Sequence, residues 1–249
     1  MARRHRLTFL LGAFLMTNAF AVAQSPEEPA SREGEQIGVV IGGGWSEHRG
    51  AFDGGGECGR IENGAGLGIM AGVSLSFRPG PGGSWGVTPR VTYEERPGRT
   101  TRETPVDKIL STDQTTGEPI IIDRSDVRAS AITLSVLNME VLYGVEVYHT
   151  SRFALDIQAG PAFQYLLSSR IVQTFKGFDA MGTEVCHDGE MPIGVTRYSM
   201  KGGVIAEISL IDGLLLLAPG IFYDYGLGGD DDAWNVSTLF AQAELRVRL

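Results

Sequence analysis

The segment RFALDIQAGPAFQYLL, residues 152–167, alternates between two kinds of side chain over its whole length. One parity holds aliphatic and aromatic residues, and the other holds small, polar and charged residues such as Asp156 and Gln158. A period of two places successive side chains on opposite faces of a β-strand. Soluble strands are typically about five to six residues long. Sixteen residues of alternation instead predict a tilted strand that crosses a bilayer and extends beyond it.

The same alternation recurs in seven other segments, whereas no helical period is sustained between them. These segments are 37–45, 67–78, 85–94, 132–147, 197–210, 215–226 and 239–249. In segment 132–147, Ile132 and Leu134 have the opposite phase to the apolar residues that follow, which predicts a bulge near Ser135 and Val136.

The connections between the eight predicted strands alternate in length. Short turns are expected at 79–84, 148–151 and 212–213, and long loops at 46–64, 97–129, 168–195 and 227–234. All long loops then lie at one end, as in bacterial outer-membrane barrels. Strands in lipid must also leave no open edge, so the last strand should pair with the first. We therefore expect an all-β fold, an eight-stranded antiparallel up-and-down transmembrane β-barrel.

The N-terminal region predicts export. Residues 1–23 combine an arginine-rich start, an apolar stretch and the small-residue motif Ala21-Val22-Ala23, which is typical of a cleaved secretory signal peptide. Residues 24–35 are polar and contain proline, which predicts a disordered lead before a barrel domain at 36–249. The location expected for such a barrel is the bacterial outer membrane.

Charge and cysteine content narrow the function. Residues 1–23 contain three arginines and no acid, so cleavage leaves 18 Lys+Arg against 30 Asp+Glu and moves the formal charge from -9 to -12. An acidic exported chain is a poor candidate for binding nucleic acid. Cys58 and Cys186 both fall in long loops at the same end, and in an oxidising compartment they predict one disulfide.

The charged parity is expected to face the barrel interior, because charge on the lipid face is costly. An eight-stranded barrel is only wide enough for side chains to fill it. Both signs occur among the predicted interior charges, which favours mutual pairing and a filled lumen over a pore. These residues are Arg90, Glu94, Glu140, Glu146, Asp156, Arg197, Lys201, Glu207, Asp224, Glu244, Arg246 and Arg248.

Aromatic residues on the apolar parity gather near both ends of the predicted strands, as two interfacial girdles require. The short-turn girdle comprises Phe77, Trp85 and Phe153. The loop-side girdle comprises Trp45, Tyr93, Tyr165, Tyr198, Tyr223 and Tyr225.

Four strand motifs resemble the PorT-like and OmpX-like outer-membrane β-barrel domains. They are WGVTPRVTYEE (85–95), LNMEVLYGVEV (137–147), LDIQAGPAFQYLL (155–167) and LLAPGIFYDYGLG (216–228). The resemblance covers residues 36–249 and implies a small eight-stranded barrel without an assigned reaction, inserted by the barrel-assembly machinery. The chain departs from that family at Leu249, where such barrels usually end on an aromatic residue.

The sequence favours a non-enzymatic outer-membrane protein with a structural or surface-interaction role, surrounded by outer-membrane lipid. One alternative is a soluble lipocalin-like carrier of an apolar ligand, in which the two faces would be inverted. Another is an outer-membrane hydrolase acting on lipid or peptide. We predict no catalytic, cofactor or metal site. One candidate metal site would join Glu47 and His48 to His187 and Asp188.

Overall fold

The computed structural model describes residues 34–53, 60–79, 84–112, 119–176, 184–191, 193–211, 214–229 and 234–249. The predicted signal peptide and most of the predicted lead lie outside these ranges. Within them, no helix is long and apolar enough to cross a membrane.

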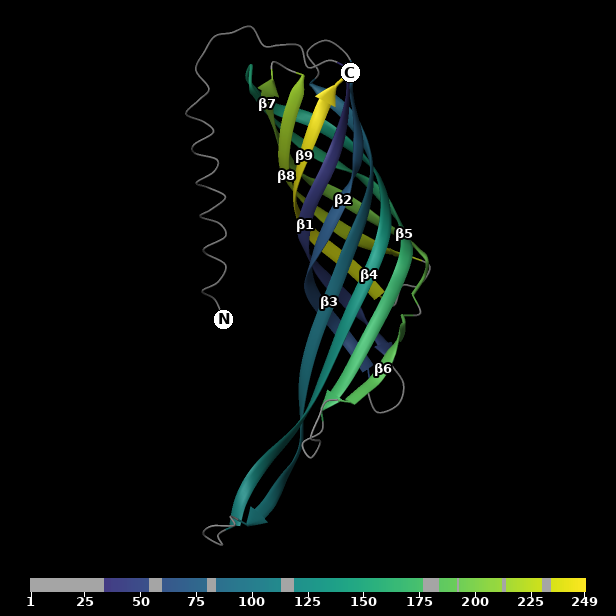
Figure 1. Cartoon of the computed structure of the whole chain (residues 1–249), viewed down its shortest axis with the longest axis vertical. Coiled ribbons are helices and arrows are strands. Elements are labelled where there is room, and N and C mark those ends of the chain that lie inside the picture. The colour runs from purple at the N-terminus through teal and green to yellow at the C-terminus, as the bar shows by residue number, and fades with distance from the viewer. Residues whose placement is uncertain are drawn as a thin grey trace.

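The described residues form nine antiparallel strands. They are β1 (Gly34–Asp53), β2 (Arg60–Arg78), β3 (Trp85–Thr112), β4 (Pro119–His149), β5 (Phe153–Lys176), β6 (Glu184–Glu190), β7 (Thr196–Ile211), β8 (Leu215–Gly229) and β9 (Trp234–Arg248). The sheet order is β4-β3-β2-β1-β9-β8-β7-β5-β6, and pairing of β4 with β5 closes a ring of eight strands. The predicted eight-stranded up-and-down barrel is confirmed (Figure 1).

The ninth strand does not enlarge the ring. β5 pairs with β7 along residues 153–165 and with β6 along residues 170–175. β6 therefore continues the line of β7 beyond the barrel, on the same edge of β5. The expectation of a loop throughout 168–195 is wrong for the residues of β5 and β6.

The strands are staggered around the barrel. Starting at Trp45 and following directly paired residues through Leu239, Tyr223, Gly202, Ala159, Tyr143, Val87 and Phe77, the path returns to β1 at Glu35. The start and end points are ten residues apart on one strand. A stagger of this kind requires the strands to tilt relative to the barrel axis.

A long hairpin replaces the predicted loop at 97–129. β3 and β4 remain paired as far as Thr112 and Pro119, whereas β2 pairs with β3 only up to Arg99. In Figure 1 this hairpin projects beyond the barrel at the end opposite the C-terminus. The alternation of polar and apolar residues did not predict this hairpin, because a strand outside the bilayer needs no continuous apolar face. Its backbone pairing nevertheless continues.

A register irregularity lies opposite the predicted position, but the bulged strand is β5, so the bulge expected within 132–147 is wrong. Pairing of β4 with β5 shifts between Ser135 and Val136, and the extra residue is Leu167 of β5. The phase change therefore occurs in β5, because Ile132 and Leu134 stay buried on the same face of β4 as Asn138. Their apolar character reflects a cluster inside the barrel instead of contact with lipid.

Candidate functional site

The two faces of the barrel wall have opposite chemistry. Outward side chains such as Val39, Ile41 and Leu67 are 59–74% exposed, whereas Arg90 and Glu94 are at most 2% exposed inside. A closed antiparallel ring with an apolar outer band and a polar interior is the architecture of outer-membrane barrels, and the chain is a barrel of this type. The soluble-carrier alternative is wrong, because it requires the aliphatic face inside.

Eleven ionic side chains inside the barrel form one unbroken series of ion pairs, here called the charged column. Their signs alternate at every step. In order from the loop side they are Asp224, Arg96, Glu94, Lys201, Glu140, Arg90, Glu244, Arg246, Glu207, Arg78 and Asp156. Because Asp224 adjoins Tyr225 of one girdle and Arg78 adjoins Phe77 of the other, the column spans the apolar band.

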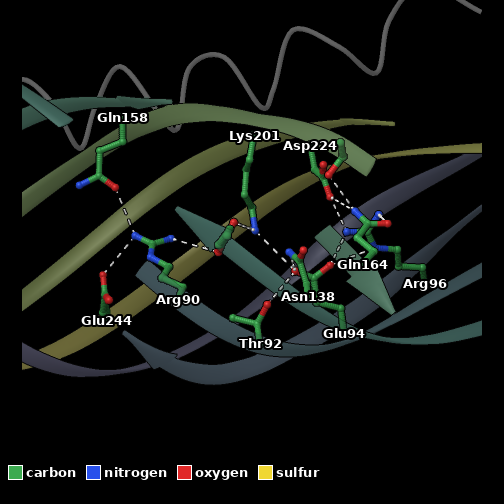
Figure 2. Close-up of polar contacts among 12 residues, drawn as sticks. Arg90, Thr92, Glu94, Arg96, Asn138, Gln158, Gln164, Lys201, Asp224 and Glu244 are labelled. Carbon is green, nitrogen blue, oxygen red and sulfur yellow. Dashed lines mark hydrogen bonds and ion pairs between the residues drawn. The ribbon is translucent and has the colours of Figure 1, made fainter. Parts of the chain in front are cut away.

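The loop-side half of the column is shown in Figure 2. The Arg96 guanidinium donates to the carboxylates of Glu94 and Asp224. Lys201 Nζ lies 3.5 Å from Glu94 Oε1 and 2.9 Å from Glu140 Oε2. Each cation thus contacts carboxylates from two different strands, so the column cross-links the wall through the lumen.

The short-turn half continues in the same way. Arg90 lies 3.8 Å from Glu140 and 3.4 Å from Glu244. Arg246 then donates to Glu244 and, at 2.5 Å, to Glu207. Arg78 accounts for the last links, donating to Glu207 at 2.8 Å and to Asp156.

Neutral side chains supply further hydrogen bonds to the column. Asn138 donates to Glu94 at 3.0 Å, and Gln164 donates to Asp224 at 3.0 Å (Figure 2). Gln158 accepts from Arg90 at 3.3 Å. Buried ions are costly unless they are paired and hydrogen-bonded, and these contacts add hydrogen bonds to Glu94, Asp224 and Arg90.

Gly38 makes room for the column on the inner face of β1. A Cβ atom at this position would lie 2.6 Å from Ser74 Oγ and 3.2 Å from Glu244 Cγ. Both separations are tighter than ordinary van der Waals contact, so a side chain here would displace Glu244 or the wall beside it.

An apolar cluster, here called the apolar cap, covers the loop side of the column. It contains Ile132, Leu134, Ile171, Met191, Trp234 and Val236. Trp234 Nε1 donates to His48 Nδ1 at 3.3 Å, and Arg197 donates to the Trp234 carbonyl oxygen. The described lumen is therefore filled by charge along its length and by hydrocarbon at its loop end.

Ten of the twelve predicted lumen charges are buried, and nine of these belong to the column. The tenth, Arg197, contacts Trp234 instead. Glu146 and Arg248 are partly exposed at the short-turn end. Sequence reasoning missed Arg78 and Arg96, although both continue the inward parity of neighbouring strand residues and could have been found by extending that parity.

The side chains of the candidate metal site do not form a cluster among the described residues. Glu47 and His48 lie on opposite faces of β1, exposed and buried respectively. Asp188 accepts a bidentate hydrogen bond from Arg170, and this bond lowers the pKa of Asp188. Within the described ranges, no three His, Cys, Asp or Glu side chains are grouped to hold a metal. Cys58 and the Cys186 side chain lie outside the described residues, so their disulfide stays a prediction.

No protein-family model and no curated protein matches the chain. It is similar to the crystal structure of Neisserial surface protein A, with 13% identity, a TM-score of 0.40, and coverage of 87% of this chain and 100% of that chain. It is also similar to the outer membrane protein OprG from Pseudomonas aeruginosa, with 11% identity, a TM-score of 0.37, and coverage of 88% of this chain and 100% of that chain. A third similar structure is the outer membrane protease OmpT from Escherichia coli, with 8% identity, a TM-score of 0.34, and coverage of 90% of this chain and 100% of that chain.

Proposed function

We propose that the chain is a non-enzymatic, non-conducting integral protein of the bacterial outer membrane that anchors surface segments through a filled barrel. The observation that carries this proposal is the charged column. Its ion pairs join opposite walls of the lumen along the full apolar height, which favours a rigid support over a channel.

The apolar cap supports the non-conducting part of the proposal. An ion crossing the lumen would have to separate column pairs and then pass Trp234, Leu134 and Met191, which are at most 3% exposed. Both steps oppose conduction, because buried charges lose their partners in the first and the ion loses its hydration in the second.

A hydrolase needs a nucleophile with a base held within reach. Among the described residues, His48 Nδ1 accepts from Trp234, and His149 Nδ1 contacts Glu146 at 3.1 Å. Neither contact includes a hydroxyl or thiol nucleophile. At these two histidines, the contacts support a structural or surface-interaction role over the hydrolase alternative.

The surface segments are extensions of strands that continue beyond the rim of the barrel. The β3–β4 hairpin has the greatest reach, because its strands stay paired as far as Thr112 and Pro119. Insertion by the barrel-assembly machinery remains part of the proposal. Pairing of β1 with β9 reaches Gln36 and Arg248, and beyond it the Leu249 amide donates to Glu35 O at 2.9 Å.

Fractionation and conductance measurements test the proposal together. We expect the protein in the detergent-extracted outer membrane, with heat-modifiable migration, and no ion current after reconstitution into planar bilayers. Recovery in osmotic-shock fluid would contradict the membrane assignment. Steady conductance by wild-type protein would instead contradict the filled barrel.

A further inference from the structure

The apolar outer band is shorter on β1 than on the other side of the barrel. On β1 only five outward positions, Ile37 to Trp45, lie between Glu35 and Glu47, and both glutamates are exposed. On β7 seven consecutive outward positions, Tyr198 to Leu210, are uncharged. The lengths can be compared only after heights on the tilted strands are matched.

The stagger of the barrel supplies this match. One circuit of the eight strands along directly paired residues is displaced by ten residues on β1. The displacement is therefore about 1.25 residues per strand, and a residue at equal height is offset by this amount from the directly paired residue. From Trp45, this correction leads to Tyr225 on β8 and Tyr198 on β7. The three aromatic side chains are 49–55% exposed and form one level of the loop-side girdle.

Above and below this band, the two walls differ in charge. Two residues above Trp45 lies Glu47, whereas two residues above Tyr225 lies Leu227, which is 58% exposed. At the short-turn end, Glu35 is level with Ile208, and Leu210 extends one outward position further. β3 resembles β1, because Glu95 follows Tyr93 on the outer face.

Relative to β1, β8 has one more outward position at each end, Leu215 and Leu227, whereas β7 has two more at the short-turn end, Ile208 and Leu210. With a rise of about 3.3 Å per residue and a tilt of about 40°, the apolar height is roughly 20 Å on β1 and roughly 30 Å on β7. The β1 side therefore falls below the apolar height of about 25 Å that is typical of outer-membrane barrels, and the β7 side exceeds it.

We propose that the bilayer is locally thinned at β1, where Glu35 and Glu47 limit the apolar band, whereas the β7–β8 wall contacts lipid of ordinary thickness. Lipid chains that kept their full length along β1 would cover the Glu35 and Glu47 carboxylates. A short apolar wall is matched by thinning the bilayer beside it. The inference rests on the proposed membrane location and adds the kind of lipid environment that one wall selects.

Folding into phosphatidylcholine vesicles of different chain length tests this inference. Wild-type protein should fold more completely in 12-carbon than in 18-carbon lipid, as measured by the heat-modifiable band. The double variant Glu35→Leu/Glu47→Leu lengthens the β1 wall and should raise the folded fraction in 18-carbon lipid about threefold. Glu103→Leu is the matched control, since Glu103 lies exposed on β3 beyond the barrel rim and should leave the profile unchanged.

A second double variant keeps the test informative if the first folds poorly. Leu210→Gln/Leu227→Gln shortens the β7–β8 wall and should move the profile toward shorter chains. Chain-length profiles identical to wild type for both double variants would overturn the thinned-wall proposal. Failure of wild-type protein to fold in every bilayer would instead overturn the membrane location on which it rests.

Discussion

Phe222 and Phe240 lie directly opposite each other in the register of β8 and β9, and both side chains are fully buried inside the barrel. Their rings form a neutral surface against the charged column. The Arg90 guanidinium lies 5.0 Å from the centre of the Phe222 ring, and Lys201 Nζ lies 4.9 Å from that of Phe240. Aromatic faces attract cations, so this pair stabilises charges that also bind carboxylates on other strands.

Replacing Phe240 should test this contribution. Phe240→Leu removes the ring beneath Lys201 and Arg96 and should lower the free energy of unfolding by about 1–3 kcal/mol. Urea unfolding in lipid vesicles measures the change. The matched control is Phe163→Leu on the outer face of β5, which should have a smaller effect. Equal effects would contradict a special role for the interior ring.

Lys201→Met should destabilise the barrel strongly, because it leaves Glu94 and Glu140 without the cation between them. Breaking a buried pair costs about 3–5 kcal/mol. Adding Glu140→Gln to Lys201→Met should recover part of the loss, and a double-mutant cycle measures the coupling. Strict additivity of the two changes would show that the ion pair contributes nothing.

Val204→Arg should impair assembly more than Ser209→Arg. Val204 is 38% exposed on the outer face of β7, whereas Ser209 lies on the inner parity near the short-turn end. An arginine facing lipid at the midplane costs about 2–4 kcal/mol. The folded fraction in vesicles compares the two variants, and equal tolerance would reverse the assigned faces.

The pH dependence of β6 docking should follow Asp188. The hydrogen bond from Arg170 lowers the pKa of Asp188 below its ordinary value, so its stabilisation is present above the ordinary Asp pKa of about 3.9. It is lost as pH falls through the lowered folded pKa. NMR titration should show that Arg170→Gln raises the pKa of Asp188, whereas Arg99→Gln leaves it unchanged.

Cys58 and Cys186 should form one disulfide. The bond would close a loop of over 120 residues, and in the chain-entropy model it stabilises the protein by about 4–5 kcal/mol. Alkylation without reductant, followed by mass determination, should find no free thiol. Two alkylated cysteines would refute the pairing.

The membrane-spanning part of the fold was predictable because lipid imposes one simple rule on every strand. In 152–167 each outward residue must be uncharged, so polarity alternates and the strand is visible without knowledge of its neighbours. The hairpin of β3 and β4 lacks that signal beyond Arg99, since water surrounds it and neither face must be apolar. Its strands became evident only from the backbone pairing of Thr112 with Pro119.

By itself, the sequence determined the eight membrane-spanning strands, their two chemically different faces and most of the charges that share one face, because each follows from parity within single strands. Tertiary structure alone decided which charges meet. Arg96 binds Asp224, 128 residues away, and Arg90 reaches Glu244 across 154 residues. These pairs depend on the stagger of the strands, which brings particular inward residues to the same height in the barrel. The stagger is set by closure of the whole ring, so it does not follow from the sequence of any single strand.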